Sequence, residues 1–163
     1  MFPDDVLHAA EQILERCRGA GLQVVTAESC TGGLIAGCLT AIAGSSDVVD
    51  RGFVTYTNQA KHQMLGVPNS LFDTVGAVSE DVARAMAEGA IRHSDGDVSL
   101  SVTGVAGPGG GSDDKPVGLV HMAVGRKNGA TLHERHIFSG DRAAVRMATV
   151  KFGLSLINKS LDN

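Results

Sequence analysis

A strand-to-helix corner at residues 27–33, with the sequence AESCTGG, constrains the fold of this chain more than any other stretch. An apolar strand is predicted before it, at residues 22–26, and an almost wholly apolar helix after it, from about residue 34 to residue 43. Open α/β sheets bind ligands at such corners, because the first N–H groups of the helix are unpaired and carry the positive end of its dipole. The same residues also suit a simple helix cap and close packing, so the corner alone leaves both interpretations open.

The rest of the chain alternates between strand and helix patterns. Further strands are predicted at residues 48–56, 97–104, 117–124 and 131–138, and further helices at about residues 4–17, 59–65, 70–75, 79–91 and 141–157. The expected helix caps are Asp4 or Asp5, Thr57 or Asn58, Ser79, and Ser139 or Asp141. This order predicts an α/β fold: one three-layer α/β/α domain over residues 1–163, with a mostly parallel, mixed sheet of about five strands that includes one antiparallel strand.

The composition excludes several classes of function. The 163 residues, 43% of them hydrophobic, fit one globular domain, and a net charge of −4 disfavours non-specific binding to nucleic acid. No apolar run approaches about 18 residues, and the start of the chain lacks a basic segment followed by an apolar one, so we expect neither a membrane span nor export. The three cysteines form no disulfide framework. We therefore expect a cytoplasmic protein with no nucleic-acid or membrane partner.

Three loops follow predicted strands and are expected to meet at one edge of the sheet: residues 27–33, 56–61 and 103–112. The third loop is rich in glycine, but it lacks the Gly-Lys-Ser/Thr ending of a Walker A loop and the spacing of a dinucleotide-binding loop. A flexible surface connection would have the same composition. Because Thr103 leads directly from a strand into glycines, which let a ligand approach the backbone closely, we favour a functional loop.

Lys61 is the most unusual residue at this edge. It falls in the first turn of a predicted helix, where the dipole favours an acid over a cation. A solvated surface lysine would cost little there, whereas the functional interpretation is that the dipole and partial burial lower its pKa and make a neutral amine available to a serine. Ser29 at the corner and Ser46 after the same helix are the two candidate nucleophiles for this Ser–Lys chemistry.

The other chemically active residues are weaker candidates. Tyr56 ends a predicted strand just before Lys61 and is expected to relay a proton or orient the amine, unless it merely packs at the strand end. Cys30 has no histidine neighbour implied by the sequence that would activate its thiol. His133 and His136 lie three residues apart on a predicted strand, hence on opposite faces, and no metal-ligand spacing is present, so we predict no metal site.

Five segments of the sequence resemble the CinA C-terminal domain family. They are residues 27–33 (AESCTGG), 43–46 (AGSS), 51–61 (RGFVTYTNQAK), 76–80 (GAVSE) and 103–111 (TGVAGPGGG). The resemblance covers nearly the whole chain, and several long motifs in one order are far more specific than one glycine loop. It implies the α/β/α fold and, for stand-alone members, hydrolysis of nicotinamide mononucleotide (NMN) to nicotinate mononucleotide and ammonia in pyridine-nucleotide salvage. Longer members add a molybdopterin-binding-like domain, for which 163 residues leave no room.

The resemblance also implies roles for individual residues. It points to Ser46, Tyr56 and Lys61 as the catalytic set, although the residues themselves leave Ser29 open as the nucleophile. The residues expected to bind substrate are Ser29, Thr31, Gly32, Gly33, Thr103, Gly104 and Arg142. The corner residues among them are assigned to an anion or oxyanion, and Thr103 and Arg142 to the nucleotide. We expect the phosphate at Gly32 and Gly33 or at Arg142, and in either case away from Lys61.

The implied reaction needs neither a metal nor a cofactor. Lys61 deprotonates Ser46, the alkoxide attacks the carboxamide, ammonia leaves with a proton from Lys61 or Tyr56, and water hydrolyses the acyl-enzyme. The alternative, from a different class, is a non-catalytic nucleotide-binding or regulatory module linked to competence or DNA damage. An intact set of these three residues favours the enzyme. We also expect a homodimer, the commonest closed assembly.

Overall fold

Every strand and helix that the sequence predicts is present, with boundaries that differ by a few residues. The computed structural model describes residues 1–162. In chain order the elements are α1 (Asp4–Ala20), β1 (Val24–Glu28), α2 (Leu34–Thr40), the 3₁₀ turn η1 (Ser45–Asp47), β2 (Val49–Val54), α3 (Asn58–Leu65), α4 (Asn69–Thr74), α5 (Glu80–Arg92), β3 (Val98–Gly104), β4 (Leu119–Arg126), β5 (Leu132–Ile137) and α6 (Arg142–Ser160). No helix among these described residues has the length and apolar content that a membrane crossing requires.

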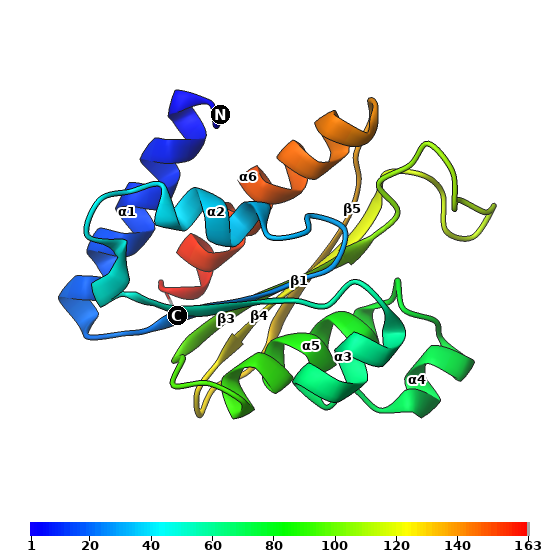
Figure 1. The fold of residues 1–163 in the computed structure, drawn as a ribbon, viewed down its shortest axis with the longest axis horizontal. Helices are drawn as coiled ribbons and strands as arrows, with labels where there is room; N and C mark the ends of the chain where they lie inside the picture. The colour runs from blue at the N-terminus through cyan, green and yellow to red at the C-terminus, as the bar shows by residue number, and fades with distance from the viewer. Residues whose placement is uncertain (163) are drawn as a thin grey trace.

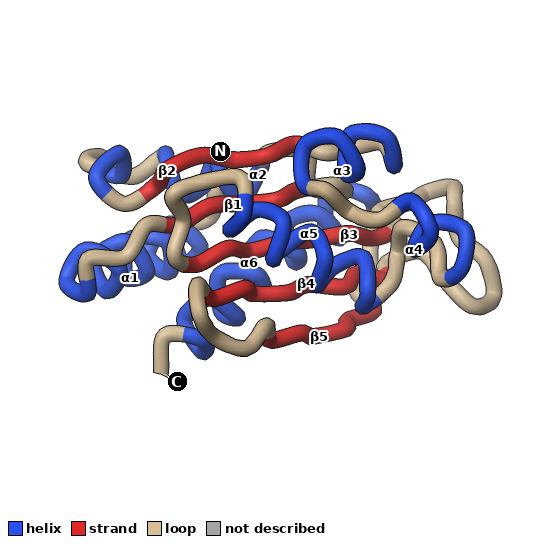
Figure 2. Tube along the Cα trace, turned by 90° about the horizontal axis from the view of Figure 1, so that it is seen from below, coloured by secondary structure: helices blue, strands red, loops and turns tan. Residues whose placement is uncertain are grey.

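The strands form one open sheet in the order β2-β1-β3-β4-β5, in which neighbouring strands lie side by side (Figure 2). β1 pairs in parallel with β2 and β3, and β4 pairs antiparallel with β3 and β5, so β4 alone runs against the others. Helices α1, α2 and α6 cover one face of the sheet, and α3, α4 and α5 cover the other (Figure 1). The predicted three-layer α/β/α fold with a mostly parallel sheet and one antiparallel strand is therefore confirmed.

Small polar residues on β3 let α5 pack closely against the sheet. The alternate apolar residues of β3 join the larger core under α1, α2 and α6. On the other face, Ser99 Oγ donates to the carbonyl of Ala87 at 2.8 Å and Ser101 Oγ to that of Ala83 at 2.6 Å. Because each buried hydroxyl has an acceptor on α5, burying it costs little free energy. This contact fixes α5 beside β3, with the segment before α5 next to the end of that strand.

Side-chain caps begin three of the helices. Thr57, Ser79 and Asp141 each accept a hydrogen bond from the backbone N–H three residues further on, at the starts of α3, α5 and α6. Each was among the expected caps. The expectation for α1 is wrong, because Pro3 is the residue before its first turn and both expected aspartates lie inside that turn. Their carboxylates still interact favourably with the positive end of the helix dipole there.

The first strand lies two residues later than predicted. The backbone of Glu28 pairs with Val54 of β2 and Val102 of β3, so this residue ends β1 and does not begin the loop. Pairing on both sides makes β1 a central strand. Its last side chain is therefore carried into the interior of the protein, where Glu28 has an exposed fraction of 0%.

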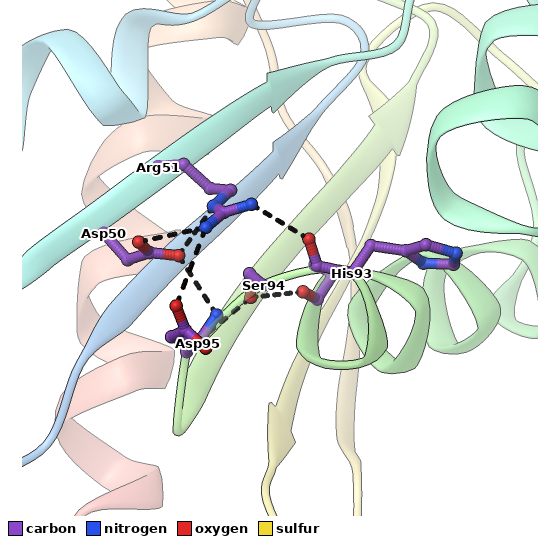
Figure 3. Close-up of polar contacts among 7 residues, drawn as sticks. Asp50, Arg51, His93, Ser94 and Asp95 are labelled. Atoms are coloured by element: carbon purple, nitrogen blue, oxygen red, sulfur yellow. Dashed lines mark hydrogen bonds and ion pairs between the residues drawn. The ribbon is translucent and has the colours of Figure 1, made fainter.

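A polar network fixes β2 to the far end of α5 (Figure 3). Arg51 contacts Asp50 at 2.7 Å, donates to the carbonyl of His93 at 3.2 Å and lies 3.9 Å from Asp95. These residues stand near the start of β2 and just after α5. The network therefore stabilises the edge strand at the end of the sheet opposite to the carboxyl ends of the parallel strands.

Candidate active site

A buried lysine and a buried serine meet at the carboxyl edge of the sheet. Ser29 directly follows β1, and Lys61 is the fourth residue of α3. Lys61 Nζ lies 3.0 Å from Ser29 Oγ and donates to the carbonyl of Thr55 at 3.0 Å. The exposed fractions are 1% for Lys61 and 9% for Ser29. A helical side chain leans toward the N-terminus of its helix, and this lean directs the amine of Lys61 toward the end of β1.

Burial lowers the pKa of Lys61 from 10.5 to about 8, because removal from water disfavours the ammonium form. A smaller interaction with the thiol of Cys30 acts in the opposite direction. At pH 7 roughly one molecule in ten then holds a neutral amine, compared with about one in a few thousand for a free lysine. Lys61 is thus suited to accept a proton from Ser29, and of the two causes expected from the sequence, the helix dipole and partial burial, burial is the one that lowers its pKa here.

Ser46 lies at the opposite edge of the sheet. It belongs to η1, before β2 begins, whereas Lys61 comes after β2 has ended. The six residues of β2 span roughly 20 Å at the usual rise of a strand. Ser46 is exposed, and its neighbour Asp47 pairs with Arg18 of α1. The structure does not bring Ser46 together with Lys61, and Ser29 takes the position beside the amine.

The buried carboxylate of Glu28 occupies the N-terminus of α2. Its oxygens accept the backbone N–H groups of Gly33, Ile35 and Ala36 at 3.0, 3.0 and 2.8 Å. They also accept the hydroxyls of Thr31, at 2.6 Å, and Thr26, at 3.2 Å. An anion is favoured at a helix N-terminus because of the dipole and the unpaired N–H groups. Here that anion is the side-chain carboxylate of Glu28.

This arrangement changes what the corner can bind. Thr31, Gly32 and Gly33 were expected to hold an anion of the substrate. The hydroxyl of Thr31 and the N–H of Gly33 are both used by Glu28, and the N–H of Gly32 donates to the carbonyl of Ser29 at 3.0 Å. Of the two expected positions for a phosphate, Arg142 is the one that lines the cavities described below.

The side chains of Tyr56 and Arg142 are hydrogen-bonded to each other, and both residues line the site. Arg142, the first residue of α6, donates to the hydroxyl of Tyr56 at 2.8 Å and to the carbonyl of Gly107 at 2.8 Å. Tyr56 is 57% exposed, and its backbone carbonyl lies 3.4 Å from the amine of Lys61. The phenol of Tyr56 is therefore oriented by Arg142, and only its main chain contacts the lysine.

A pocket of about 220 Å³ joins these groups. Among the expected site residues, it is lined by Ser29, Tyr56, Lys61, Thr103, Gly104 and Arg142. The hydroxyl of Thr103 donates to the carbonyl of Ala77 at 2.8 Å, so it holds the segment before α5 against β3. At Gly104 a Cβ atom would lie 2.7 Å from the carbonyl oxygen of Leu119, so the close approach of β4 requires glycine. The predicted meeting of the three loops at one edge is confirmed.

A second cavity of about 630 Å³ adjoins this pocket and shares Ala106 and Arg142 with it. Arg146, one turn after Arg142 on α6, also lines the second cavity. Its Nε donates to the carbonyl of Cys30 at 3.1 Å and its Nη2 to that of Thr31 at 2.8 Å. The cavity therefore has two guanidinium groups in its wall, and one of them holds the loop that follows Ser29.

Two residues of this site were not predicted from the sequence. Glu28 was expected only as a member of the corner, and no role was expected for Arg146. Signals for both exist: an acid just before a helix start complements the dipole, and Arg146 repeats Arg142 at a spacing of four residues, hence on one helix face.

Thr55 contains the one buried side-chain polar atom that lacks a hydrogen-bond partner in the part of the chain the structure describes. We expect Thr55→Val to leave the free energy of unfolding unchanged or to raise it by about 1 kcal/mol, because valine keeps the shape and removes an unpaired hydroxyl. Urea unfolding followed by circular dichroism measures this. Thr26→Val is the matched control, since it removes a hydroxyl bonded to Glu28, and we expect it to lose about 1–2 kcal/mol. An equal loss in both variants would contradict the prediction.

The remaining candidates do not form a second site. Burial raises the pKa of the Cys30 thiol to about 11, which disfavours the reactive thiolate. His133 contacts His121 at 2.9 Å on the face of α5, whereas His136 stacks on Phe138, and the predicted opposite faces of the two histidines are thereby confirmed. Among residues 1–162, no group of three or more histidines, cysteines or acids is arranged to hold a metal ion.

An open α/β sheet with a serine and a lysine buried together at its carboxyl edge defines an α/β protein with a candidate nucleophilic site. The chain belongs to the CinA C-terminal domain family, whose model matches residues 7–161. This confirms the resemblance drawn from the five motifs. A crystal structure of the competence/damage inducible protein CihA from Agrobacterium tumefaciens is similar at a TM-score of 0.96 and 51% identity, over 100% of this chain and 99% of that one.

Relatives of two lengths are similar to this chain. Nicotinamide-nucleotide amidohydrolase PncC of Enterobacter agglomerans is 52% identical over 84% of this chain and 84% of its own length, and PncC of Escherichia coli K12 is 44% identical over 96% and 95%. A CinA-like protein of Geobacter sulfurreducens is 49% identical over 88% of this chain, but the match spans only 35% of that protein. The chain thus spans most of the shorter relatives and about a third of the longer one.

Proposed function

We propose that this protein is an amidase that hydrolyses NMN to nicotinate mononucleotide and ammonia. The observation on which the proposal rests is the 3.0 Å contact between the Nζ atom of Lys61 and the Oγ atom of Ser29 in a buried position. A serine beside a neutral amine is an activated nucleophile for acyl transfer. The names of the shorter relatives, nicotinamide-nucleotide amidohydrolase, support the choice of substrate.

In the proposed mechanism, neutral Lys61 accepts the proton of Ser29 while Oγ bonds to the carboxamide carbon and the carbonyl π pair moves to oxygen. The C–N bond then breaks, and the leaving nitrogen takes the proton from the Lys61 ammonium to become ammonia. Water attacks the acyl-serine, Lys61 takes its proton and returns it to Ser29 Oγ, and nicotinate mononucleotide leaves. We propose that the ring of Tyr56 covers the reacting carboxamide, because a hydrogen bond from Arg142 to the tyrosine hydroxyl holds the ring in place.

The substrate phosphate is proposed to bind in the larger cavity, at Arg142. We expect Arg142→Met to raise KM for NMN about tenfold or more while kcat changes less, since charge-assisted hydrogen bonds contribute about 1.5–3 kcal/mol. Initial rates over a range of NMN concentrations measure both constants. Arg135→Met, an exposed arginine on β5, is the control and should leave KM within about twofold. An unchanged KM in the Arg142 variant would place the phosphate elsewhere.

The pH dependence tests Lys61 as the base. Because the deprotonated amine is the active form and its pKa is lowered to about 8, kcat/KM should rise with pH and level off above that value. Rates at NMN concentrations well below KM, in buffers of constant ionic strength from pH 6 to about 10, give the profile. A rate that continues to climb to the pKa of a free lysine would mean that another group is the base.

The proposed function itself is tested by ammonia release. Purified protein incubated with NMN and a metal chelator should produce one ammonia for each nicotinate mononucleotide, measured by a coupled dehydrogenase assay and by chromatography. No product in any condition would refute the proposed function, and an absolute requirement for added metal would refute the Ser–Lys scheme.

A homodimer and a cytoplasmic location stay predictions. Light scattering of the same sample measures whether the protein is a dimer.

A further inference from the structure

Nearly every backbone N–H at the corner after β1 has an acceptor. Those of Gly33, Ile35 and Ala36 donate to Glu28. The other acceptors are the carbonyl of Val102 for Ser29, that of Ser29 for Gly32 and that of Thr31 for Leu34. Within residues 29–36, all of which the structure describes, two N–H groups donate to no other residue, those of Cys30 and Thr31.

Only one of these two groups belongs to a residue that reaches the pocket. Cys30 lines the pocket beside Ser29 and is 5% exposed, whereas Thr31 is 0% exposed. The N–H of Cys30 donates to no other residue, and the sulfur of its own side chain is only a weak acceptor. An unpaired buried N–H costs about 1–3 kcal/mol and is rare in folded proteins. An acceptor supplied by the reacting molecule in the pocket would pair this N–H.

The direction of this N–H is fixed by the peptide on which it lies. The carbonyl of Ser29 accepts the N–H of Gly32 at 3.0 Å, and in a planar trans peptide the N–H points opposite to the carbonyl. The N–H of Cys30 therefore points away from Gly32. Arg146 holds the next two carbonyls from the side of α6, and Glu28 holds the hydroxyl of Thr31. The loop is thus clamped on both sides by groups that do not line the small pocket.

We propose that the backbone N–H of Cys30 is the oxyanion donor of this site, and that Arg146 is a positioning residue that keeps it directed at the reacting carbonyl. The inference rests on the proposed function, in which Ser29 is the nucleophile. When Ser29 Oγ bonds to the carboxamide carbon, negative charge develops on the carbonyl oxygen. The N–H of the residue after the nucleophile stabilises this charge in α/β-hydrolases, and such a donor interacts more strongly with the oxyanion than with the neutral carbonyl.

An amide-to-ester replacement tests the donor directly. Cell-free translation with chemically acylated tRNA allows Cys30 to be replaced by alanine, which keeps the N–H, or by lactic acid, which has an ester oxygen in its place. We expect the lactate form to show a kcat for NMN at least about tenfold below that of Cys30→Ala, with KM within about twofold. Equal kcat values in the two forms would overturn the proposal.

The matched control is the same pair of replacements at Ser70. Ser70 is exposed in the first turn of α4, where its N–H has no partner within the helix. The alanine and lactate forms at this position should not differ in kcat. A difference there as large as at Cys30 would show that the ester acts through general destabilisation and would overturn the assignment.

Arg146→Met tests the positioning role without unnatural residues. Methionine keeps part of the apolar stem and removes both hydrogen bonds to the loop carbonyls. We expect kcat to fall about tenfold or more with KM within about twofold, the reverse of the pattern for Arg142→Met, at a melting temperature that confirms folding. A rise in KM alone would make Arg146 a substrate contact and overturn its positioning role.

A fluorophosphonate probe separates this inference from the proposed function. It phosphonylates a reactive serine and needs the same oxyanion donor, but it requires no NMN. If wild-type protein fails to hydrolyse NMN, the proposed substrate is wrong, and the rate of Ser29 labelling in the alanine and lactate forms still decides the inference. We expect slower labelling of Ser29 in the lactate form by about tenfold, read by mass spectrometry, and equal rates would overturn it.

Discussion

Ser29→Ala is expected to lower kcat for NMN hydrolysis by about a thousandfold or more, whereas Ser46→Ala should stay within about twofold of wild type. Ser29 Oγ lies 3.0 Å from the buried amine of Lys61, and removal of a nucleophile or its base abolishes the covalent route. Ser46 is exposed in η1, at the other edge of the sheet. Ammonia release at saturating NMN measures both variants, and their melting temperatures report folding.

Lys61→Met completes this comparison. Nucleophile and base act as a unit, so the Lys61 variant should lose about as much activity as Ser29→Ala, and the double variant little more than either single one. Methionine suits a buried position, so the fold should persist. If Ser46→Ala were inactive and Ser29→Ala retained most of its turnover, the nucleophile would be Ser46, and the contact between Ser29 and Lys61 would not be catalytic.

Glu28→Ala is expected to lower the free energy of unfolding by about 3–5 kcal/mol, a larger loss than that expected for Thr26→Val. The carboxylate is fully buried and accepts three backbone N–H groups and two hydroxyls. Without it those donors lose their acceptor, and the N-terminus of α2 loses the negative charge that complements its dipole. Urea unfolding at neutral pH measures the change.

Two further variants make this prediction specific. Glu28→Gln keeps the volume and one carbonyl oxygen, but its NH₂ group must face donors, so we expect an intermediate loss. Glu15→Ala changes an exposed glutamate on α1 and should stay within about 0.5 kcal/mol of wild type. A loss from Glu28→Ala no greater than that from Glu15→Ala would mean that water replaces the carboxylate without cost.

The fold was predictable because its signals are local. The order of strand and helix patterns along the chain, together with the alternating residues of β3 and the short turn before β5, is enough to predict the layers of the fold and one antiparallel strand. The position of the site at the carboxyl edge follows from the same order. The boundary of β1 was misplaced because its end is set by pairing with β2 and β3, which no local pattern records.

The separation of Ser46 from Lys61 could be predicted from the sequence, whereas the hydrogen bonds of Glu28 could not. A strand was predicted between Ser46 and Lys61, and residues before and after one strand stand at opposite edges of a sheet. That placement alone separates Ser46 from Lys61, although the family resemblance favoured Ser46 as the nucleophile. By contrast, the use of the α2 N-terminus by Glu28 depends on where a single carboxylate sits in three dimensions. Hydrogen bonds of that kind cannot be read from spacing.

The burial of Lys61 couples the proton equilibrium of its amine to folding. Its pKa is about 8 in the folded chain and close to 10.5 in an unfolded one. Below pH 8 the folded protein must hold a dehydrated ammonium, and between the two pKa values it has released a proton that the unfolded chain keeps. Folding is therefore favoured progressively as the pH rises across this range, by about 3 kcal/mol in all from this one group. At neutral pH the folded chain is thus less stable than it would be with a solvated lysine, because burial disfavours the ammonium form. The same burial keeps a fraction of the Lys61 amine uncharged.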